Sequence, residues 1–401
     1  MIHKIYRYLL GVALALFIVG CGGSSSSVDH LVEELGIGVD TFDENEKSYL
    51  YNLFQTEYYW NDKVSDSFDY TPYTEPQPMI DDLKYSALDR WSFALTRQEY
   101  DNMATQQTSG FGFSSDVDFT VYMTNIGSPA ESAGLLRGDR ITEINGQPIT
   151  NALLAQASQN INQSTDFTLD RQGFPVALSI TSQHYSFSVI SYSTVQSPAG
   201  SSVGYLRFDE FTENATFELE EAFTFFKTQN INKLVVDLRY NPGGSINTAS
   251  IFLDKLGGSL NGKVQFSMFW NPQSSSQNET LYFDTDSNSM TPMKLVFLTT
   301  GNSASASELA INTMKPYLGN NVAIVGETTH GKPVGMAGRT NGSYIYFLIN
   351  FMVENSIGFY DYFNGLPPDC AVSDTDYTHA LGDPAEALLH EALYYIDNGH
   401  C

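Results

Sequence analysis

The sequence predicts a multidomain α/β protein with a small helical N-terminal domain, then a small β domain, then a larger α/β domain. Its length of 401 residues allows two or three separate cores. Apolar residues make up 42% of the chain, so we expect globular packing rather than disorder. The pattern changes near residue 108, from helical spacing to short β-type runs, and near residue 191, to alternating strands and helices.

The first 20 residues predict a secretory signal peptide. A short basic start precedes the apolar run 9–19, which is too short to cross a membrane comfortably. The run ends in "IVGC", which resembles the lipobox of bacterial lipoproteins. This predicts lipidation of Cys21, with residues 21–29 as a Gly/Ser tether. An ordinary signal peptide with an incidental cysteine is the alternative.

Gly22, directly after that cysteine, favours export to the outer membrane, by resemblance to the sorting rule for bacterial lipoproteins. We therefore expect a lipid-anchored, periplasm-facing protein of the bacterial cell envelope.

Charge and cysteine content restrict the partners further. The net charge of −26 would repel nucleic acid, so we expect no nucleic-acid partner. After Cys21, only Cys370 and Cys401 remain, and two thiols in an exported protein most often form a disulfide. Two free thiols are the alternative. We expect no metal, because "HEALYY" at His390 lacks the second histidine of a zinc motif and no cysteine pair has ligand spacing. We also expect no cofactor.

Residues 30–107 are predicted to form the helical N-terminal domain. Both "ENEKSYLYNLFQTEYYW" and "PMIDDLKYSALDRWSFALTRQEYDNM" carry apolar residues at helical spacing. In residues 191–401, the strand-like runs "SVGYLRF", "KLVVDLRY", "KLVFLTT" and "NVAIVGE" are separated by helical segments. This alternation predicts a layered α/β core, with residues 258–291 as a long irregular insertion.

Residues 108–190 carry short β-type runs, and one stretch within them resembles a known domain. "SPAESAGLLRGDRITEINGQPI" is similar to the core of a PDZ domain of the bacterial protease type. The upstream "GFGF" fits the loop with which such domains bind a terminal carboxylate through backbone N–H groups; its residues are Gly110, Phe111, Gly112 and Phe113. A strand-adding groove of this kind predicts protein or peptide partners with apolar C-termini. A small β domain without a ligand is the alternative.

The stretch "GETTHGKP", which ends at Pro333, nearly spells a phosphate-binding P-loop. A true P-loop has Ser or Thr after its lysine, to reach Mg²⁺, and begins a helix there. Pro333 offers neither a hydroxyl nor an N–H group, and the sequence after it is Gly-rich and then β-like. The sequence therefore argues against nucleotide binding.

Simple geometry instead allows Lys332 to return beside a serine-rich segment. A helix from Ser305 to Leu318 carries the chain about 20 Å away at ~1.5 Å per residue. The strand 322–327 then returns about 20 Å at ~3.3 Å per residue. A serine at a helix start lies beside free N–H groups that suit an oxyanion. A desolvated lysine can lose its proton near neutral pH and act as a general base for the serine hydroxyl.

Three motifs, "DLRYNPGG", "LTTGNSASASE" and "GETTHGKP", follow the PDZ-like run in this order. Together they resemble the C-terminal-processing (tail-specific) serine protease family, and the resemblance covers nearly the whole mature chain, including "LDRWSFALTRQEY". It implies a ClpP/crotonase-like α/β core and a Ser–Lys catalytic dyad. The roles it implies here are nucleophile Ser305 (with Ser303 and Ser307 as neighbours), general base Lys332, oxyanion-hole donors Ala306 and either Gly243 or Gly244, and supporting residue Glu308.

The sequence departs from the family pattern at two positions. Met336 stands where the family commonly has a glutamine that orients the lysine, and His330 stands where an aromatic residue is usual. His330 is therefore a rival base. The expected function is that of an envelope serine endopeptidase that cleaves proteins recognised near their C-termini, with an adaptor protein as a further partner to consider. The alternative is a PDZ-bearing lipoprotein scaffold with weak or absent activity.

Overall fold

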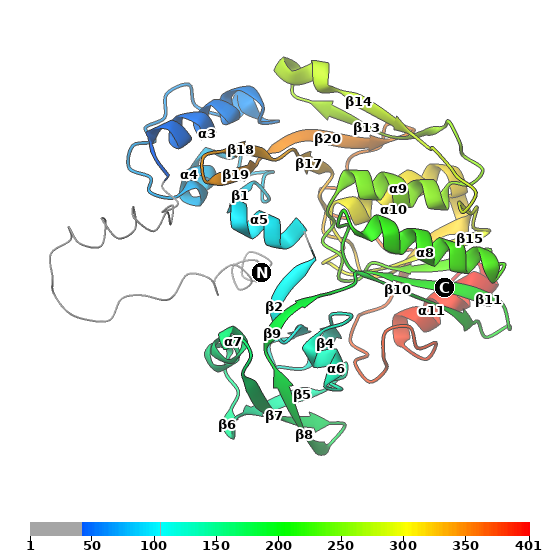
Figure 1. Cartoon of the computed structure of the whole chain (residues 1–401). Helices are drawn as coiled ribbons and strands as arrows, with labels where there is room; N and C mark the ends of the chain where they lie inside the picture. Colours follow the sequence, from blue (N-terminus) through cyan, green and yellow to red (C-terminus); the bar gives the residue numbers. More distant parts are fainter. Residues whose placement is uncertain (1–41, 105) are drawn as a thin grey trace.

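The computed structural model describes residues 42–104 and 106–401 (Figure 1). The predicted signal peptide, the lipidation site Cys21, the tether and the first residues of the predicted N-terminal domain lie outside the described residues. Within the part that is described, no helix is long and apolar enough to cross a membrane. The three-part α/β fold class is confirmed.

The largest part is built on a six-stranded sheet in the order β10-β11-β12-β15-β16-β21. Neighbouring strands from β11 to β21 run parallel, and β10 pairs antiparallel with β11. In sheet order the strands span Ile190–Gln196, Ser202–Phe208, Lys233–Asp237, Lys294–Thr299, Val322–Gly326 and Cys370–Ala371. Because parallel strands end at the same edge, the loops after β12, β15 and β16 come together there. These loops carry the three motifs.

Helices cover both faces of this sheet (Figure 1). In β12, Leu234 and Val236 pack toward α8, α9 and α10, whereas Val235 packs toward α11. These helices span Ala215–Thr228, Ile246–Leu256, Ala306–Leu318 and Ala387–Asn398. Burial on both faces explains why these strands are continuous apolar runs in the sequence.

The segment 258–291, expected to be irregular, contains two strands, so that prediction was wrong. Strand β13 (Val264–Trp270) pairs antiparallel with β14 (Glu279–Tyr282), across the short 3-10 helix η2 (Pro272–Gln277). On its other side β13 pairs with β20 (Ile349–Asn355), which also pairs with β17 (Val334–Met336). The longer pairing of β13 is with β20, which lies far away in the sequence, so the pattern of polar and apolar residues within 258–291 did not predict the strand.

The N-terminal part contains α3 (Glu44–Thr56), α4 (Pro76–Leu83) and α5 (Arg97–Ala104), with the 3-10 turn η1 (Asn61–Lys63). The second helical prediction was only partly right, because strand β1 (Phe93–Thr96) interrupts it. This strand pairs with β19 (Tyr344–Phe347), which also pairs with β18 (Arg339–Asn341).

The core of this part is not made by the N-terminal residues alone. Phe54 and Ile80 pack in one cluster with Val334, Tyr346 and Ile349, which follow the candidate base in the sequence. The N-terminal part is therefore packed directly against the strands beyond Lys332.

The β domain consists of the short strands that the sequence predicts, together with two helices. Its main sheet has the order β6-β5-β7-β8, and β3 pairs with β4 and β2 with β9. Helix α7 spans Asn151–Gln159, and α6 spans Pro129–Ser132. The strands β2 to β9 span Gln107–Gly110, Phe113–Ser115, Val121–Thr124, Arg140–Ile144, Gln147–Pro148, Ser164–Arg171, Phe174–Thr181 and Gln183–Ser186.

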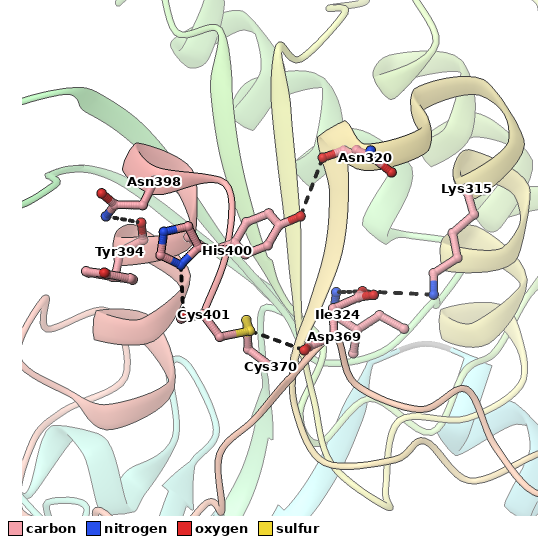
Figure 2. The surroundings of a disulfide bond; sticks show 10 residues. Lys315, Asn320, Ile324, Asp369, Cys370, Tyr394, Asn398, His400 and Cys401 are labelled. Carbon is pink, nitrogen blue, oxygen red and sulfur yellow. Dashed lines mark hydrogen bonds and ion pairs between the residues drawn. A yellow bond between two sulfur atoms is a disulfide. The ribbon is translucent and has the colours of Figure 1, made fainter.

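Cys370 and Cys401 are joined, with a Cα–Cα distance of 5.5 Å (Figure 2). The bond links the last residue of the chain to β21, the edge strand of the large sheet. Beside it, the Asp369 carboxylate accepts a hydrogen bond from Ile324 N at 2.8 Å and lies 4.0 Å from Lys315 Nζ (Figure 2). Helix α11 is thus tied at its far end to the sheet that it covers.

Candidate active site

Ser305 lies at the turn between β15 and helix α10, one residue before the helix begins. Its backbone has φ 56° and ψ −112°, a region that a non-glycine residue rarely occupies. This strained turn holds Ser305 partly exposed between two buried serines.

The hydroxyls of the neighbouring serines have structural partners. Ser303 Oγ donates to Leu238 O at 2.7 Å and accepts from Thr300 N at 3.1 Å. Ser307 Oγ donates to Asn241 O at 3.1 Å. Both residues are fully buried. Of the three serines in the motif, Ser305 is the one with access to a substrate.

Glu308 connects this turn to the Lys332 loop. Its fully buried carboxylate accepts hydrogen bonds from Ser305 N at 2.9 Å and, on the other loop, from Gly331 N at 2.6 Å and Lys332 N at 2.8 Å. Thr329 Oγ1 donates to it at 2.5 Å. Burial raises the pKa of Glu308, and these donors act in the opposite direction. One carboxylate therefore fixes the backbones of both candidate catalytic residues.

Lys332 has a part of its surface exposed, but its amine lies in surroundings that remove it from water. This burial lowers the pKa of Lys332 to about 8, against smaller opposing effects of the Asp89 and Glu308 charges. Among the described residues the amine has no hydrogen-bond or ion-pair partner. A lysine in this state can be a free amine near neutral pH, as a general base must be.

His330 lies two residues before Lys332 and is held by the N-terminal part. Trp91 Nε1 donates to His330 Nε2 at 3.0 Å. Burial lowers the pKa of His330, and the positive charge of Arg90 acts in the same direction. The lone pair of Nε2 is thus occupied, so the structure disfavours His330 as the base for Ser305.

The first turn of α10 faces the glycine turn of "DLRYNPGG". A Cβ atom on Gly243 would lie 2.7 Å from Ser305 Cβ and 3.0 Å from Ala306 N, so only glycine fits there. Gly243 N donates to Asn241 Oδ1 at 2.8 Å. By contrast, Ala306 N and Gly244 N have no partner among the described residues. These two N–H groups are the ones available to an oxyanion.

The "GFGF" loop has two backbone donors without partners in the described part of the chain, Phe111 N and Gly112 N. Phe111 itself is buried in the domain core against Phe167, with ring centroids 5.0 Å apart. A Cβ atom on Gly110 would lie 2.6 Å from Ser158 Oγ on α7, and one on Gly112 would lie 2.3 Å from Ser128 Cβ. The loop is therefore tightly packed, and it presents N–H groups as a carboxylate-binding loop requires.

A buried ion network joins the β domain to the core, and the sequence gave no sign of it. Arg137, from the turn "LLRGD", lies 2.7 Å from Asp374. Asp374 also binds Arg239 at 3.0 Å, and Arg239 in turn binds Glu386 at 2.9 Å and Asp237 at 3.0 Å. Arg239 lies four residues before Gly243 in the same motif, so the β domain contacts the segment that carries the candidate oxyanion hole.

One group of potential metal ligands occurs among the described residues, formed by Cys370, Glu391 and Cys401. Its two sulfur atoms are bonded to each other, so they are occupied in this structure.

Comparisons with known proteins agree with this arrangement. The sequence pattern of Peptidase family S41 matches residues 202–372, that of the Peptidase S41 N-terminal domain matches residues 45–93, and that of a PDZ domain matches residues 124–161. A carboxyl-terminal-processing protease of Synechocystis sp. (strain ATCC 27184 / PCC 6803 / Kazusa) is 24% identical over 77% of this chain and 74% of that protein. A "Probable CtpA-like serine protease" of Staphylococcus aureus (strain N315) is 28% identical over 63% of this chain and 49% of that protein.

Solved structures share the fold. An S41 protease structure from Bacteroides fragilis NCTC 9343 matches with a TM-score of 0.76 at 21% identity, over 87% of this chain and 97% of that one. The photosystem II D1 C-terminal processing protease matches with a TM-score of 0.51 at 19% identity, over 82% of this chain and 92% of that one.

Fold and motifs together define a PDZ-bearing serine peptidase with an α/β core. The chain belongs to peptidase family S41. It spans about half the length of the staphylococcal relatives and about three-quarters of the cyanobacterial one.

Proposed function

We propose that this protein is an endopeptidase in which Ser305 is the nucleophile and Lys332 is the general base. The observation that carries the proposal is the Glu308 carboxylate, which accepts N–H groups from Ser305 on one side and from Gly331 and Lys332 on the other. Two loops from different strand ends are thereby locked together at the residues that the reaction needs.

The chemistry follows from these positions. The Lys332 amine accepts the Ser305 Oγ proton as Oγ attacks the carbonyl carbon of the scissile peptide bond. The oxyanion that forms accepts hydrogen bonds from Ala306 N and Gly244 N, at the positive end of α10. The Lys332 ammonium then returns the proton to the leaving amine, which leaves an acyl-enzyme. Water hydrolyses the acyl-enzyme by the same proton transfers.

We further propose that the PDZ domain binds the free, apolar C-termini of protein substrates. The two unpartnered N–H groups of the "GFGF" loop support this, together with β3, which has a strand partner on one side only among the described residues. The match of residues 124–161 to the sequence pattern of a PDZ domain also supports this proposal.

The location is also part of the proposal. The leader sequence supports a lipid-anchored, periplasm-facing envelope protein, modified at Cys21 and stabilised by the Cys370–Cys401 bond. Intact-mass measurement of protein recovered from the envelope should give the mass of a lipidated chain without free thiols. Two alkylatable thiols, or a chain that keeps residues 1–20, would contradict these features.

The test of function uses an unfolded reporter protein with a free apolar C-terminus, incubated with the chain and followed by mass spectrometry. The active enzyme should yield fragments, and Ser305→Ala should yield none. Ser303→Ala is the matched control and should retain cleavage, since its hydroxyl only supports the loop. If wild type and Ser305→Ala bind the reporter alike and neither cleaves it, the chain is a scaffold.

A second arm compares free-acid and amidated forms of one peptide substrate. The free acid should be cleaved faster, because an amide cannot accept the loop N–H groups as a carboxylate does. Equal rates would mean that the PDZ domain does not select C-termini.

A further inference from the structure

No group in the Lys332 loop forms a hydrogen bond that would orient the Lys332 amine. Hydrogen bonds to Glu308 fix the backbone of Gly331 and Lys332, but none reaches the Lys332 side chain. Met336, where an amide would be expected, packs in the apolar cluster of the N-terminal part, and its thioether sulfur is only a weak acceptor. Some other group must hold the amine.

Residues 89–92 of the N-terminal part lie against the Lys332 loop. Trp91 Nε1 donates to His330 Nε2 at 3.0 Å, and Arg90 Nη2 donates to Phe363 O at 3.1 Å. Phe363 O is itself packed on the loop, because a Cβ atom on Gly331 would lie 2.4 Å from it. A third contact joins Ser92 Oγ to the Ile349 N–H group at 3.0 Å. The segment thus contacts the base loop and its neighbours at three points.

Asp89 is the anchor of this segment and is only 1% exposed. Its carboxylate accepts from Tyr58 Oη at 2.8 Å, and from Trp91 N at 2.9 Å. Ser92 contributes two more donors, N at 3.0 Å and Oγ at 2.6 Å. All of these donors are neutral, and no cation forms an ion pair with Asp89 among the residues that the structure describes. A buried anion without a bound cation therefore lies on a segment that contacts the loop of a lysine without a bound anion.

The charges around Lys332 are few. Asp89 on the N-terminal part and Glu308 on α10 both raise the pKa of Lys332, Asp89 more than Glu308, against the larger effect of burial. Glu308 already binds four other donors, three of them backbone N–H groups. His330 is neutral, and Arg90 is directed to Phe363 and to the Trp91 ring. Of the two anions, Asp89 is thus the one that accepts no hydrogen bond from the Ser305 turn or from the Lys332 loop.

We propose that Asp89 is a positioning residue for Lys332: its buried carboxylate, fixed on the segment 89–92, provides the counter-charge that orients the amine. This inference rests on the proposed function, because it presumes that Lys332 is the base. It also makes the N-terminal part a component of the catalytic machinery. Docking of residues 89–92 would then be required for full activity, beyond any effect on stability.

The test is Asp89→Asn, which keeps the size of the side chain and an acceptor for the Trp91 and Ser92 N–H groups. Loss of the negative charge should lower the pKa of Lys332, so the acid limb of the kcat/KM profile should move to lower pH. The alkaline plateau of kcat should fall by roughly tenfold to a hundredfold, as is typical when a group that orients a reactive residue is removed. Tyr58→Phe, which removes one hydrogen bond to Asp89 but keeps its charge, is the matched control and should leave the limb in place.

A second measurement does not depend on cleavage. In the inactive Ser305→Ala background, the rate at which Lys332 reacts with an amine-specific reagent is followed against pH by peptide mass spectrometry. The midpoint should move to lower pH when Asp89 is replaced by Asn. Asp89→Ser serves the same purpose if the Asn variant does not fold, since its hydroxyl still accepts from the two N–H groups.

An unchanged labelling midpoint in a folded variant would overturn the inference. If the midpoint moves but Lys332→Ala still cleaves, the inference about Asp89 holds and the proposed catalytic dyad fails.

Discussion

Lys332 and Arg239 are two cations in the same α/β core, and they differ in whether the fold gives them anionic partners. Arg239 is 1% exposed and binds Asp237, Asp374 and Glu386. Lys332 is half-buried, with its amine in surroundings that remove it from water, and has no bound anion in the described part of the chain.

The direction of each pKa shift depends on the carboxylates near the cation and not on burial alone. Burial by itself lowers the pKa of either group. At Arg239 the charges of Asp237 and Glu386 more than reverse this effect, so its pKa is raised. At Lys332 the more distant charges of Asp89 and Glu308 offset burial only in part, and the pKa falls to about 8. Arg239 therefore keeps its positive charge, whereas Lys332 can lose its proton near a pH of about 8.

The largest effect is expected at the base. Lys332→Met should lower kcat/KM by roughly a thousandfold, because no group remains to accept the Ser305 proton. The free energy of unfolding should change much less than for a paired buried cation, since the Lys332 amine forms no hydrogen bond or ion pair in the described part of the chain. Peptide cleavage and urea unfolding measure the two quantities, and half-buried Lys315→Met in the last turn of α10 is the matched control. Cleavage within tenfold of wild type would remove Lys332 from the mechanism.

The same substitution at the other cation should act on stability. Arg239→Met leaves the buried carboxylates of Asp237 and Glu386 uncompensated, so we expect the free energy of unfolding to fall by about 3–5 kcal/mol. Urea unfolding measures this. A loss below about 1 kcal/mol would mean that the network is hydrated and that the contrast with Lys332 is not one of pairing.

The pH dependence of cleavage separates the two cations directly. Below a pH of about 8 Lys332 is mostly protonated and cannot accept a proton, so the rate should rise about tenfold per pH unit and then level off. Arg239 keeps its proton throughout and contributes no step. A rate that is flat between about pH 6 and 9 would contradict the assignment of Lys332 as the base.

A smaller effect is expected where the network reaches the PDZ domain. Arg137→Met removes one partner of Asp374, but Asp374 keeps Arg239 at 3.0 Å and the Tyr240 hydroxyl at 2.5 Å. We expect a loss of about 1–2 kcal/mol in the free energy of unfolding, clearly less than for Arg239→Met. An equal loss would show that Arg137, and not Arg239, is the centre of the network.

The smallest effect on catalysis is expected at the rival base. His330→Phe leaves the Trp91 indole N–H without its acceptor, which costs about 1 kcal/mol. Cleavage should therefore fall by less than about tenfold. A loss as large as that of Lys332→Met would make His330 part of the proton transfer.

Much of the fold could be predicted because its signals are local. The parallel strands are buried on both faces and therefore appear as apolar runs, as in "KLVVD". Strands β13 and β1 were missed because their pairing with β20 and β19 depends on residues far along the chain. Neither strand has an alternating pattern that marks one face as buried.

The residues of the candidate site also fall into those that the sequence predicts and those that only the structure reveals. Ser305, Lys332 and Glu308 lie in motifs whose order and spacing are visible in the sequence. Asp89 was not found, although "LDRW" was noted within the resemblance, because a buried aspartate and a turn-capping aspartate look alike in sequence. The resemblance already assigned the nucleophile to Ser305, and the structure adds that the hydroxyls of Ser303 and Ser307 have structural partners.

By itself the sequence determined which chemical groups the protein carries and which strand ends they follow. Only the tertiary structure decided how those groups ionise and which of them cooperate. The reason is physical: a strand or helix is specified by residues a few positions apart, whereas a pKa depends on water exclusion and on charges that the fold brings close. Asp89 and Lys332 are far apart along the chain, and contacts of Trp91 with His330 and of Ser92 with Ile349 bring the Asp89 segment against the Lys332 loop.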